Sequence, residues 1–255
     1  MKYIIADIHG CYAQYKALLD AVHFREEDEL YVLGDAMDRG PEPIRVIQDL
    51  MGRPNAFYIL GNHDAAMLTL MGKLAVDVSE ESLQALTVQL MREYEAWLCD
   101  GGASTAEQFR RLSREERADI LDYLADAPVF DMVQQDGKLY ILVHAGIRNF
   151  DTEKELDDYE PADFLFEPAD YSRKYFPGDR IFLVTGHTYT ASIRPDGQPL
   201  VYGEKGHIAL DCGCVYGGNL AAYCIDTGEI FYVPGPQPEK SEKRNPGGGK
   251  SFTFS

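Results

Sequence analysis

Side chains that can bind metals or transfer protons occur in five short clusters along this 255-residue chain. Each cluster follows a run of apolar residues, at the point where the run meets a glycine or a polar turn. The clusters are Asp7 with His9, Asp35 with Asp38, Asn62 with His63, His144, and His187. Carboxylate, imidazole and amide groups together form a borderline-hard ligand set, which favours manganese, with iron or zinc as alternatives, over calcium.

Six of these groups are candidate metal ligands, namely Asp7, His9, Asp35, Asn62, His144 and His187. One ion that also holds water and substrate has no room for six protein ligands, so we expect two divalent ions. Asp35 stands in the middle of the set and is the candidate to bridge them. Known two-metal hydrolytic sites hold their ions about 3.5–4 Å apart.

Each of these residues also has an ordinary structural explanation. A histidine in a core is more often a hydrogen-bonded filler than a ligand, and an asparagine after glycine is a common turn residue. The joint pattern of five clusters after five strand-like runs favours the metal site. For His207 a structural role is favoured, and for Trp97 core packing is favoured over contact with substrate.

The apolar runs before the clusters have the length and the stops of buried strands. They cover residues 2–6, 29–33, 56–60, 139–143 and 181–184. Segments 12–22 and 41–51 have helical spacing, so the order strand, helix, strand, helix, strand predicts an α/β fold with neighbouring parallel strands. In such folds ligands bind at the C-terminal ends of the strands.

The remaining segments predict one large domain with additions. Residues 65–127 have mostly helical patterns and form an insertion, and 151–178 is expected to be a loop or lid with little regular structure. From residue 199 onward, short strands at 201–202, 207–210, 220–225 and 230–233 predict a second, more antiparallel sheet. We expect a single domain over 1–233 and a flexible C-terminal tail over 234–255.

Composition and charge exclude several classes of protein. The chain is 45% hydrophobic, enough for a sizeable core, so wholesale disorder is excluded. A formal charge of −18 would repel nucleic acids and anionic bilayers, so we expect no nucleic-acid or membrane partner. No apolar run reaches the roughly 18 residues of a membrane span, and the five scattered cysteines read as reduced thiols. We therefore expect a cytoplasmic protein.

Five segments of the chain together resemble the ordered motifs of the calcineurin-like metallophosphoesterases, over about residues 3 to 230. They are Asp7-Ile8-His9, Gly34-Asp35-Ala36-Met37-Asp38-Arg39-Gly40, Gly61-Asn62-His63-Asp64, His144-Ala145-Gly146 and Gly186-His187-Thr188. The resemblance implies a sandwich of two mixed β-sheets flanked by helices, with the active site at the C-terminal ends of the strands.

The resemblance also implies a role for each site residue. Asp7, His9 and Asp35 would hold the first ion, and the second would be held by Asp35, Asn62, His144 and His187. Water activated by both ions would attack phosphorus. His63 would act as the general acid, Asp38 would hold its imidazole, and Arg39 would bind phosphate oxygens.

Details of the motifs resemble one branch of the family. The Asp-Arg-Gly ending of the second motif is similar to that of serine/threonine phosphoprotein phosphatases and their relatives, the symmetrical diadenosine tetraphosphatases. Tyr189 stands where other branches have a further histidine ligand, which supports this branch. Trp97, the pair Gly101-Gly102 and Thr105 resemble a helical segment of small bacterial and phage protein phosphatases.

The chain departs from the family pattern at two places. Asp64 replaces the glutamate of many protein phosphatases, as it also does in the dinucleotide-cleaving relatives. The segment 164–168 lacks the second phosphate-binding arginine, for which Arg173 and Arg180 are the candidate substitutes.

From these features we expect a metal-dependent phosphomonoester hydrolase of the serine/threonine protein phosphatase type. Its substrate would be a phosphorylated protein, a phosphopeptide or a small phosphoester. The alternative within enzymes is a symmetrical diadenosine tetraphosphatase-like nucleotide hydrolase. A third hypothesis, a non-catalytic binding module, rests on the missing arginine.

Overall fold

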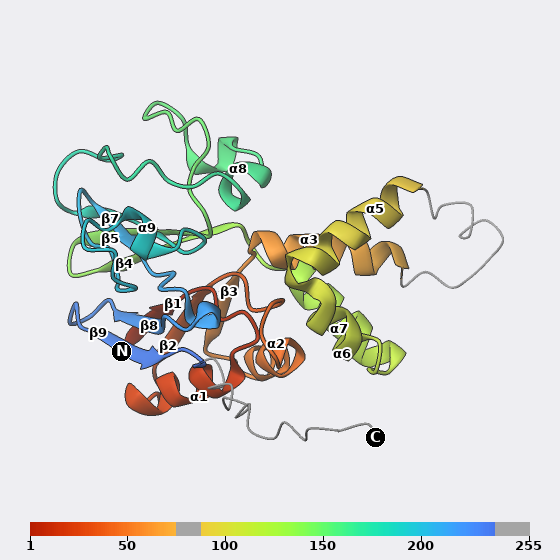
Figure 1. Cartoon of the computed structure of the whole chain (residues 1–255). Helices are drawn as coiled ribbons and strands as arrows, with labels where there is room; N and C mark the ends of the chain where they lie inside the picture. The colour runs from red at the N-terminus through yellow and green to blue at the C-terminus, as the bar shows by residue number, and fades with distance from the viewer. Residues whose placement is uncertain (75–87, 238–255) are drawn as a thin grey trace, which may run out of the picture.

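Two β-sheets lie face to face, with helices packed outside the first sheet and a long irregular segment outside the second (Figure 1). The structure is a computed structural model that describes residues 1–74 and 88–237. Both sheets contain parallel and antiparallel strands. The expected sandwich of two mixed sheets flanked by helices is therefore confirmed.

The first sheet has five strands and carries the N-terminal half of the predicted pattern. Its order in space is β3 (Ala56–Ile59), β2 (Glu29–Leu33), β1 (Lys2–Ile5), β8 (Asn219–Cys224) and β9 (Ile230–Pro234). Strands β1, β2 and β3 run parallel, and β8 and β9 are added antiparallel beside β1. The C-terminal ends of β1, β2 and β3 therefore meet at one edge.

The second sheet has four strands. Its order is β4 (Phe130–Gln135), β5 (Lys138–Val143), β6 (Ile181–Thr185) and β7 (His207–Ala209). Strands β5, β6 and β7 are parallel, and β4 pairs antiparallel with β5.

Helices connect these strands and build the insertion. They are α1 (Tyr12–Ala21), α2 (Pro43–Met51), α3 (Asn62–Leu74), α5 (Val88–Trp97), the π-helix η1 (Leu98–Gly102), α6 (Ala103–Phe109), α7 (Arg114–Ala125), the 3-10 helix η2 (Leu156–Asp158), α8 (Ala162–Leu165), α9 (Thr190–Ile193) and the 3-10 helix η3 (Cys214–Tyr216). The helical prediction for 65–127 is confirmed over the described residues, and 75–87 lie outside them. Ser113 and Glu116 form a capping box at the start of α7, as their spacing indicates.

Alternation along β1 shows how the layers are built. Tyr3 and Ile5 point to the helices, where they join the largest core, whereas Ile4 points to the second sheet and packs between the sheets. A third cluster covers the outer face of the second sheet with aromatic residues from segment 151–178, including Tyr159 and Phe164. That segment contains only η2 and α8 as regular structure, as expected.

Three details of the strand predictions are wrong. The strands after residue 199 do not form a sheet of their own, because β7 joins the second sheet and β8 and β9 join the first. Segment 201–202 is no strand, since only Tyr202 makes an isolated bridge, with Ala209. Strand β4 is missed because, of its six residues, only Val133 is buried, which leaves a weak apolar signal. An apolar pattern locates a strand but does not name its partner.

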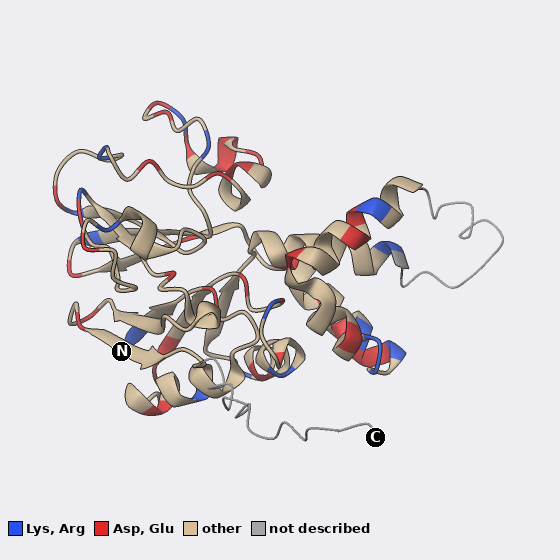
Figure 2. Cartoon of the chain, in the orientation of Figure 1, with Lys and Arg blue, Asp and Glu red and all other residues tan. Residues whose placement is uncertain are grey.

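The predicted boundaries of the domain and of its tail stay predictions, because residues 238–255 lie outside the described part. Acidic residues are spread over several elements, including α7 and α8, so the net charge of −18 is not confined to one segment (Figure 2). Among the helices of the described residues, none combines the length and the apolar character needed to span a membrane.

Candidate metal centre

The structure brings the predicted site residues together from both sheets. Asp7 and His9 follow β1, Asp35 follows β2, and Asn62 begins α3, with two residues between it and the end of β3. His144 follows β5 and His187 follows β6 in the second sheet. The two sheets thus present the C-terminal ends of their parallel strands to a common centre.

The backbone at this centre is strained. Ten non-glycine residues of the described chain have positive φ, and six of them are predicted site residues: Asp7, His9, Asp35, Asp38, Arg39 and His187. Each such conformation costs on the order of 1–3 kcal/mol and persists only where the surroundings enforce it. Gly61 allows one of these turns, because a Cβ there would lie 2.2 Å from Asp35 Oδ1.

Two groups of ligand atoms share Asp35. The ligand atoms of Asp35, His144 and His187 lie within 4.8 Å of one another, and so do those of His9, Asp35 and His63. Asp35 Oδ2 is 3.5 Å from His9 Nε2 and also 3.5 Å from His144 Nε2. The position of this oxygen between the two groups is the one expected for a bridging ligand.

Asn62 belongs to the second group. Its Oδ1 lies 2.8 Å from His144 Nε2 and 2.9 Å from His187 Nδ1. The hydrogen-bond network assigns a proton to His144 Nδ1, which donates to the Leu33 carbonyl over 2.8 Å. His144 Nε2 then carries no proton, and its lone pair faces the amide oxygen of Asn62. A cation between these two atoms would stabilise this arrangement.

His9 is oriented in the same way. Its Nδ1 donates to the Met37 carbonyl over 2.8 Å, which leaves the Nε2 lone pair directed into the centre. A backbone carbonyl that holds one ring nitrogen is the usual support of a metal-binding histidine.

Asp7 lies at the centre but is not a member of either group within 4.8 Å. Both of its carboxylate oxygens accept a hydrogen bond from the His187 backbone N–H, at 3.1 and 2.9 Å. Burial raises the pKa of Asp7 well above its usual value, and the charges of Asp211 and Asp35 raise it further.

Asp211 is a partly buried acid of this centre that sequence reasoning missed. Burial raises its pKa to about 6, and Asp35 contributes to this shift. The rule that found the other clusters also applies here, because Asp211 follows the apolar end of β7 and precedes a Cys-Gly turn. Its backbone carbonyl accepts from the Thr190 N–H, and its Oδ1 accepts from the Gly213 N–H.

Electrostatics at this centre fit the binding of cations. Burial lowers the pKa of His144 to about 4 and that of His187 to about 4, so both imidazoles are neutral near pH 7 and their lone pairs are available. Burial also raises the pKa of Asp35 to about 6. Buried carboxylates beside neutral imidazoles form a donor set that lacks positive charge, and divalent ions would supply it.

Arg39 is the cation that faces the centre. Its two terminal nitrogens lie 2.6 Å from His9 Nε2 and 2.6 Å from His63 Nε2. Asp100 lies 3.7 Å from the guanidinium, and the Tyr216 ring lies 5.7 Å from its central carbon. Because a single lone pair on His9 Nε2 cannot accept from Arg39 and bind an ion, metal binding requires Arg39 to release His9.

Asp38 is fully buried and accepts three hydrogen bonds from side chains. Its Oδ2 accepts from His63 Nδ1 at 2.8 Å and from the Trp97 indole N–H at 2.7 Å. Its Oδ1 accepts from the Thr105 hydroxyl at 2.6 Å, whose oxygen also accepts from the Asp38 backbone N–H at 2.9 Å. The predicted contact between Asp38 and His63 is therefore present.

Trp97 and Thr105 support this pair, a role that sequence reasoning missed. Trp97 is buried, as expected for core packing, but its indole N–H is committed to Asp38. Gly102 makes this packing possible, because a Cβ there would lie 2.2 Å from Trp97 Cε2. The resemblance of this segment to small protein phosphatases was the signal that could have found it.

His63 is held in a charged setting. Burial lowers its pKa, but the hydrogen bond to Asp38 and the charge of Asp35 outweigh burial, so the pKa of His63 lies above its usual value. Asp64, the next residue, accepts from the Asp35 backbone N–H at 2.7 Å and from the Tyr58 hydroxyl at 2.6 Å. Asp64 therefore holds the loop of the shared carboxylate.

Neither candidate for the second arginine lies at this centre. Arg173 contacts Asp170, at 3.6 Å, and its carbonyl accepts from His207 Nε2 at 2.9 Å. Arg180 precedes β6 and is therefore at the opposite end of that strand from His187. His207 packs between the Tyr171 and Tyr175 rings, which agrees with the structural role favoured for it.

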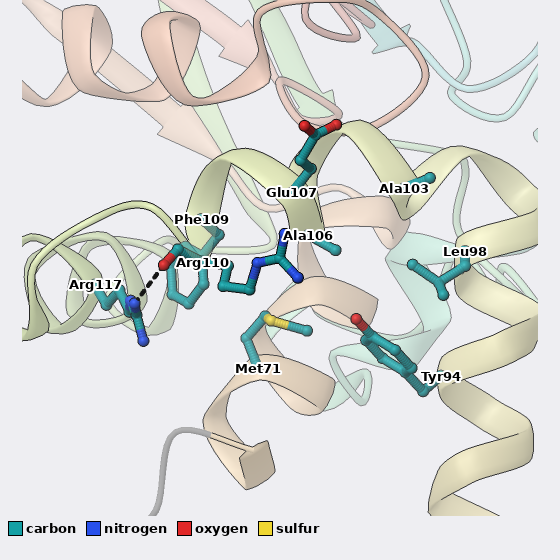
Figure 3. A pocket seen from close by; sticks show the side chains of 9 residues that line it. All are labelled: Met71, Tyr94, Leu98, Ala103, Ala106, Glu107, Phe109, Arg110 and Arg117. Atoms are coloured by element: carbon teal, nitrogen blue, oxygen red, sulfur yellow. Dashed lines mark hydrogen bonds between the residues drawn. The ribbon is translucent and has the colours of Figure 1, made fainter.

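A cavity of about 400 Å³ lies apart from these residues, among the helices of the insertion (Figure 3). Its wall includes Met71 of α3, Tyr94 of α5 and Arg110 after α6. None of the predicted site residues lines it, so it has no direct part in the chemistry of the centre.

Comparisons with known proteins agree with this geometry. The family model for calcineurin-like phosphoesterases matches residues 3–222. An asymmetrical bis(5′-nucleosyl)-tetraphosphatase of Halalkalibacterium halodurans is 26% identical over 94% of this chain and 96% of its own. A symmetrical bis(5′-nucleosyl)-tetraphosphatase of Wigglesworthia glossinidia brevipalpis is 33% identical over 57% of this chain and 44% of its own. A crystal structure assigned provisionally as a diadenosine tetraphosphatase has a TM-score of 0.65 and 25% identity, and the match covers 93% of this chain and 94% of that one.

Proposed function

The chain belongs to the calcineurin-like phosphoesterase family, and we propose that it hydrolyses dinucleoside tetraphosphates in a metal-dependent reaction. The sequence favoured the phosphoprotein phosphatases and kept the tetraphosphatases as the alternative. The relatives described above are named as tetraphosphatases, and one of them matches nearly the whole chain. The observation that carries the proposal is therefore this match, together with two groups of ligand atoms that share Asp35.

Two divalent ions would be held by the predicted ligands. As the resemblance implies, Asp7, His9 and Asp35 would hold one ion, although the structure groups His9 and Asp35 with His63 and not with Asp7. The other ion would be held by Asp35, Asn62, His144 and His187. When bound, the ions would supply positive charge that lowers the pKa of water and neutralises phosphate oxygens. Manganese is the proposed ion, with iron or zinc as alternatives, because the oxygen and imidazole donors are borderline-hard.

Arg39 would bind phosphate oxygens of the substrate. Its planar guanidinium suits a phosphate group, to which it can donate two parallel hydrogen bonds. In the structure these donors are occupied by His9 Nε2 and His63 Nε2. A phosphate that takes over the donors frees both ring nitrogens, one as a ligand atom and the other as a site for a proton.

His63 would then give a proton from Nε2 to the leaving oxygen. Its Nδ1 is held by Asp38 over 2.8 Å, so only Nε2 is available for transfer. The Asp38 carboxylate stabilises the imidazolium form, and Trp97 and Thr105 keep that carboxylate in place. A general acid of this kind contributes about 10²–10⁴-fold to the rate where the leaving group is poor.

A direct test compares two substrates with the purified, manganese-loaded protein. We expect diadenosine tetraphosphate to give nucleotide products, separated by ion-exchange chromatography, and a phosphoserine peptide at equal concentration to be cleaved far more slowly. Two molecules of ADP or the pair AMP and ATP would both support the proposal. The variant Asp38→Asn is the control for a protein with the metal ligands intact and the proposed acid impaired. It keeps all six proposed ligands but weakens the hydrogen bond that holds His63.

Release of phosphate from the peptide alone would overturn the proposal in favour of the second candidate, a serine/threonine protein phosphatase. The observation that favours this candidate is the segment with Trp97, Gly101-Gly102 and Thr105, which resembles small protein phosphatases. Cleavage of neither substrate by protein that contains both ions would favour the binding-module hypothesis.

A further inference from the structure

A pocket of about 610 Å³ opens directly beside His63. One wall is the face of α3 that continues from the metal centre, with Ala66 and Leu70. The other lining residues come from α5, from Asp100 of η1 and from Phe166, which follows α8. These elements can be followed in Figure 1. Its volume is in the range of pockets that enclose small organic ligands.

The dimensions of this pocket suit one nucleotide. Its lining on α3 extends from Asn62 to Leu70, which at 1.5 Å per residue is about 12 Å along the helix. Because Asn62 and His63 stand at the near end, a group bound at the far end is about one sugar and one phosphate away from the reacting atoms.

Phe166 offers a flat surface at this pocket. The residue is 56% exposed, which is unusual for a large aromatic residue that lines a cavity. The small side chains of Ala65 and Ala66 on α3 also line the pocket and take up little of its space. An aromatic ligand that stacks on Phe166 would bury apolar surface that the protein alone leaves exposed.

Charges at the pocket select the uncharged end of a substrate. Glu93 and Asp100 line it, and among the described residues no lysine or arginine does. Two carboxylates disfavour phosphate groups inside the pocket, whereas the guanidinium of Arg39 attracts them at the metal centre. Carboxylates also accept hydrogen bonds from the exocyclic amino group of a base.

We propose that this pocket binds the nucleobase of the departing nucleotide, with the base stacked on Phe166. The assignment to the departing side follows from His63, which lines the pocket and is the proposed proton donor to the leaving oxygen. This inference rests on the proposed function and adds a binding site for the base. Phe166 is then a residue that selects nucleotide substrates over other phosphoesters.

The binding test uses the protein's own fluorescence. Trp97 is the single tryptophan of the chain and lines the pocket, so its emission reports on a bound base. Manganese-loaded protein is titrated with AMP and with ribose 5-phosphate, which has a hydroxyl group in place of the base of AMP. We expect saturable quenching by AMP and at least tenfold weaker binding of ribose 5-phosphate.

Two variants locate the effect. Phe166→Leu should weaken AMP binding about tenfold, as removal of one stacking partner of a base does, and should leave ribose 5-phosphate unchanged. Phe57→Leu is the matched control, because Phe57 is 42% exposed on β3 and does not line the pocket. Thr69→Phe, at an exposed position of the lining, should fill the pocket and weaken AMP binding independently.

Kinetics separate this inference from the proposed function. Phe166→Leu should lower kcat/KM for diadenosine tetraphosphate about tenfold, and Phe57→Leu should leave it unchanged. If the wild-type protein cleaves diadenosine tetraphosphate but Phe166→Leu changes neither kcat/KM nor AMP binding, the pocket assignment is wrong and the function stands. If AMP binds as expected but no dinucleoside tetraphosphate is cleaved, the function is wrong and the base pocket stands. Equal binding of AMP and ribose 5-phosphate, or Phe166-dependent binding of a phosphopeptide without AMP binding, would overturn the inference.

Discussion

The buried hydroxyl of Thr105 gives the sharpest test of the support around Asp38. Thr105→Val keeps the shape of the side chain and removes only the hydroxyl. That hydroxyl donates to Asp38 Oδ1 at 2.6 Å and accepts from the Asp38 backbone N–H at 2.9 Å, and both residues are fully buried. The substitution therefore leaves one carboxylate oxygen with a donor fewer and one backbone N–H without this partner.

The size of the effect follows from these two contacts. Loss of a hydrogen bond to an ionised group costs about 1.5–3 kcal/mol, and an unsatisfied buried donor costs about 1–3 kcal/mol. Because such terms are not additive, we expect Thr105→Val to lower the free energy of unfolding by about 2–5 kcal/mol. Thr105→Ser keeps the hydroxyl and loses one methyl group, which costs about 1 kcal/mol.

Urea unfolding of both variants and of the wild type measures these free energies, with a Tm shift of about 2–4 °C per kcal/mol as a second readout. We also expect Thr105→Val to lower kcat for phenyl phosphate, a substrate with a poor leaving group, more than it raises KM, because Asp38 holds the proposed acid His63 and does not bind the ground state. Thr105→Ser should retain most of the wild-type kcat. Thr105→Val that is as stable and as active as Thr105→Ser would refute the reasoning.

Three further predictions concern the acid, the metals and the surface. His63→Asn should lower kcat for phenyl phosphate by about 10²–10⁴-fold and much less for 4-nitrophenyl phosphate, whose leaving group needs no proton; equal losses would contradict the acid role. Manganese should raise the Tm of the wild type by mass action. His187→Ala should bind less manganese, as measured by elemental analysis, and manganese should raise its Tm by less. Unchanged metal content would remove His187 from the proposed ligands. Burial raises the pKa of Asp49, but hydrogen bonds from Arg53 and Tyr15 outweigh burial and hold it below the usual 3.8. The ionised form of Asp49 therefore stabilises the fold above pH 3.8, and this contribution is lost as pH falls through the lower folded pKa. Unfolding measured from about pH 7 to pH 3 should show Asp49→Asn less stable than the wild type at neutral pH, with a difference that shrinks in acid. A constant difference between the two proteins would contradict this prediction.

Patterns within single segments were enough to locate most of the strands and the groups at their ends. Strand β2 begins and ends where its apolar run predicts, and Asp35 follows it after Gly34. The strand partners were not predictable in the same way. Strand β8 pairs with β1 through Tyr3 and Cys224, more than two hundred residues apart, and nothing in either segment specifies the other.

In the candidate site, too, some features are local to one segment and others depend on distant segments. The types of the proposed ligands and their places after strands are local properties, because one short motif carries each of them. The support of Asp38 is not local, since Trp97 and Thr105 lie 59 and 67 residues away on an inserted helical segment. Asp211 lacked a matching motif, although its place after β7 gave a signal of the same kind.

The sequence by itself determined which side chains can bind ions and transfer a proton, and it placed them at strand ends. Both can be predicted from short segments, because side-chain chemistry and the alternation of buried residues are local properties of the chain. Only the tertiary structure decided that Arg39 reaches both His9 and His63, that neither Arg173 nor Arg180 joins them, and that an apolar pocket opens beside His63. These features depend on how α3, α5 and the segment after α8 pack against one another. Packing of that kind follows from the combined shape of many side chains, which no single motif contains.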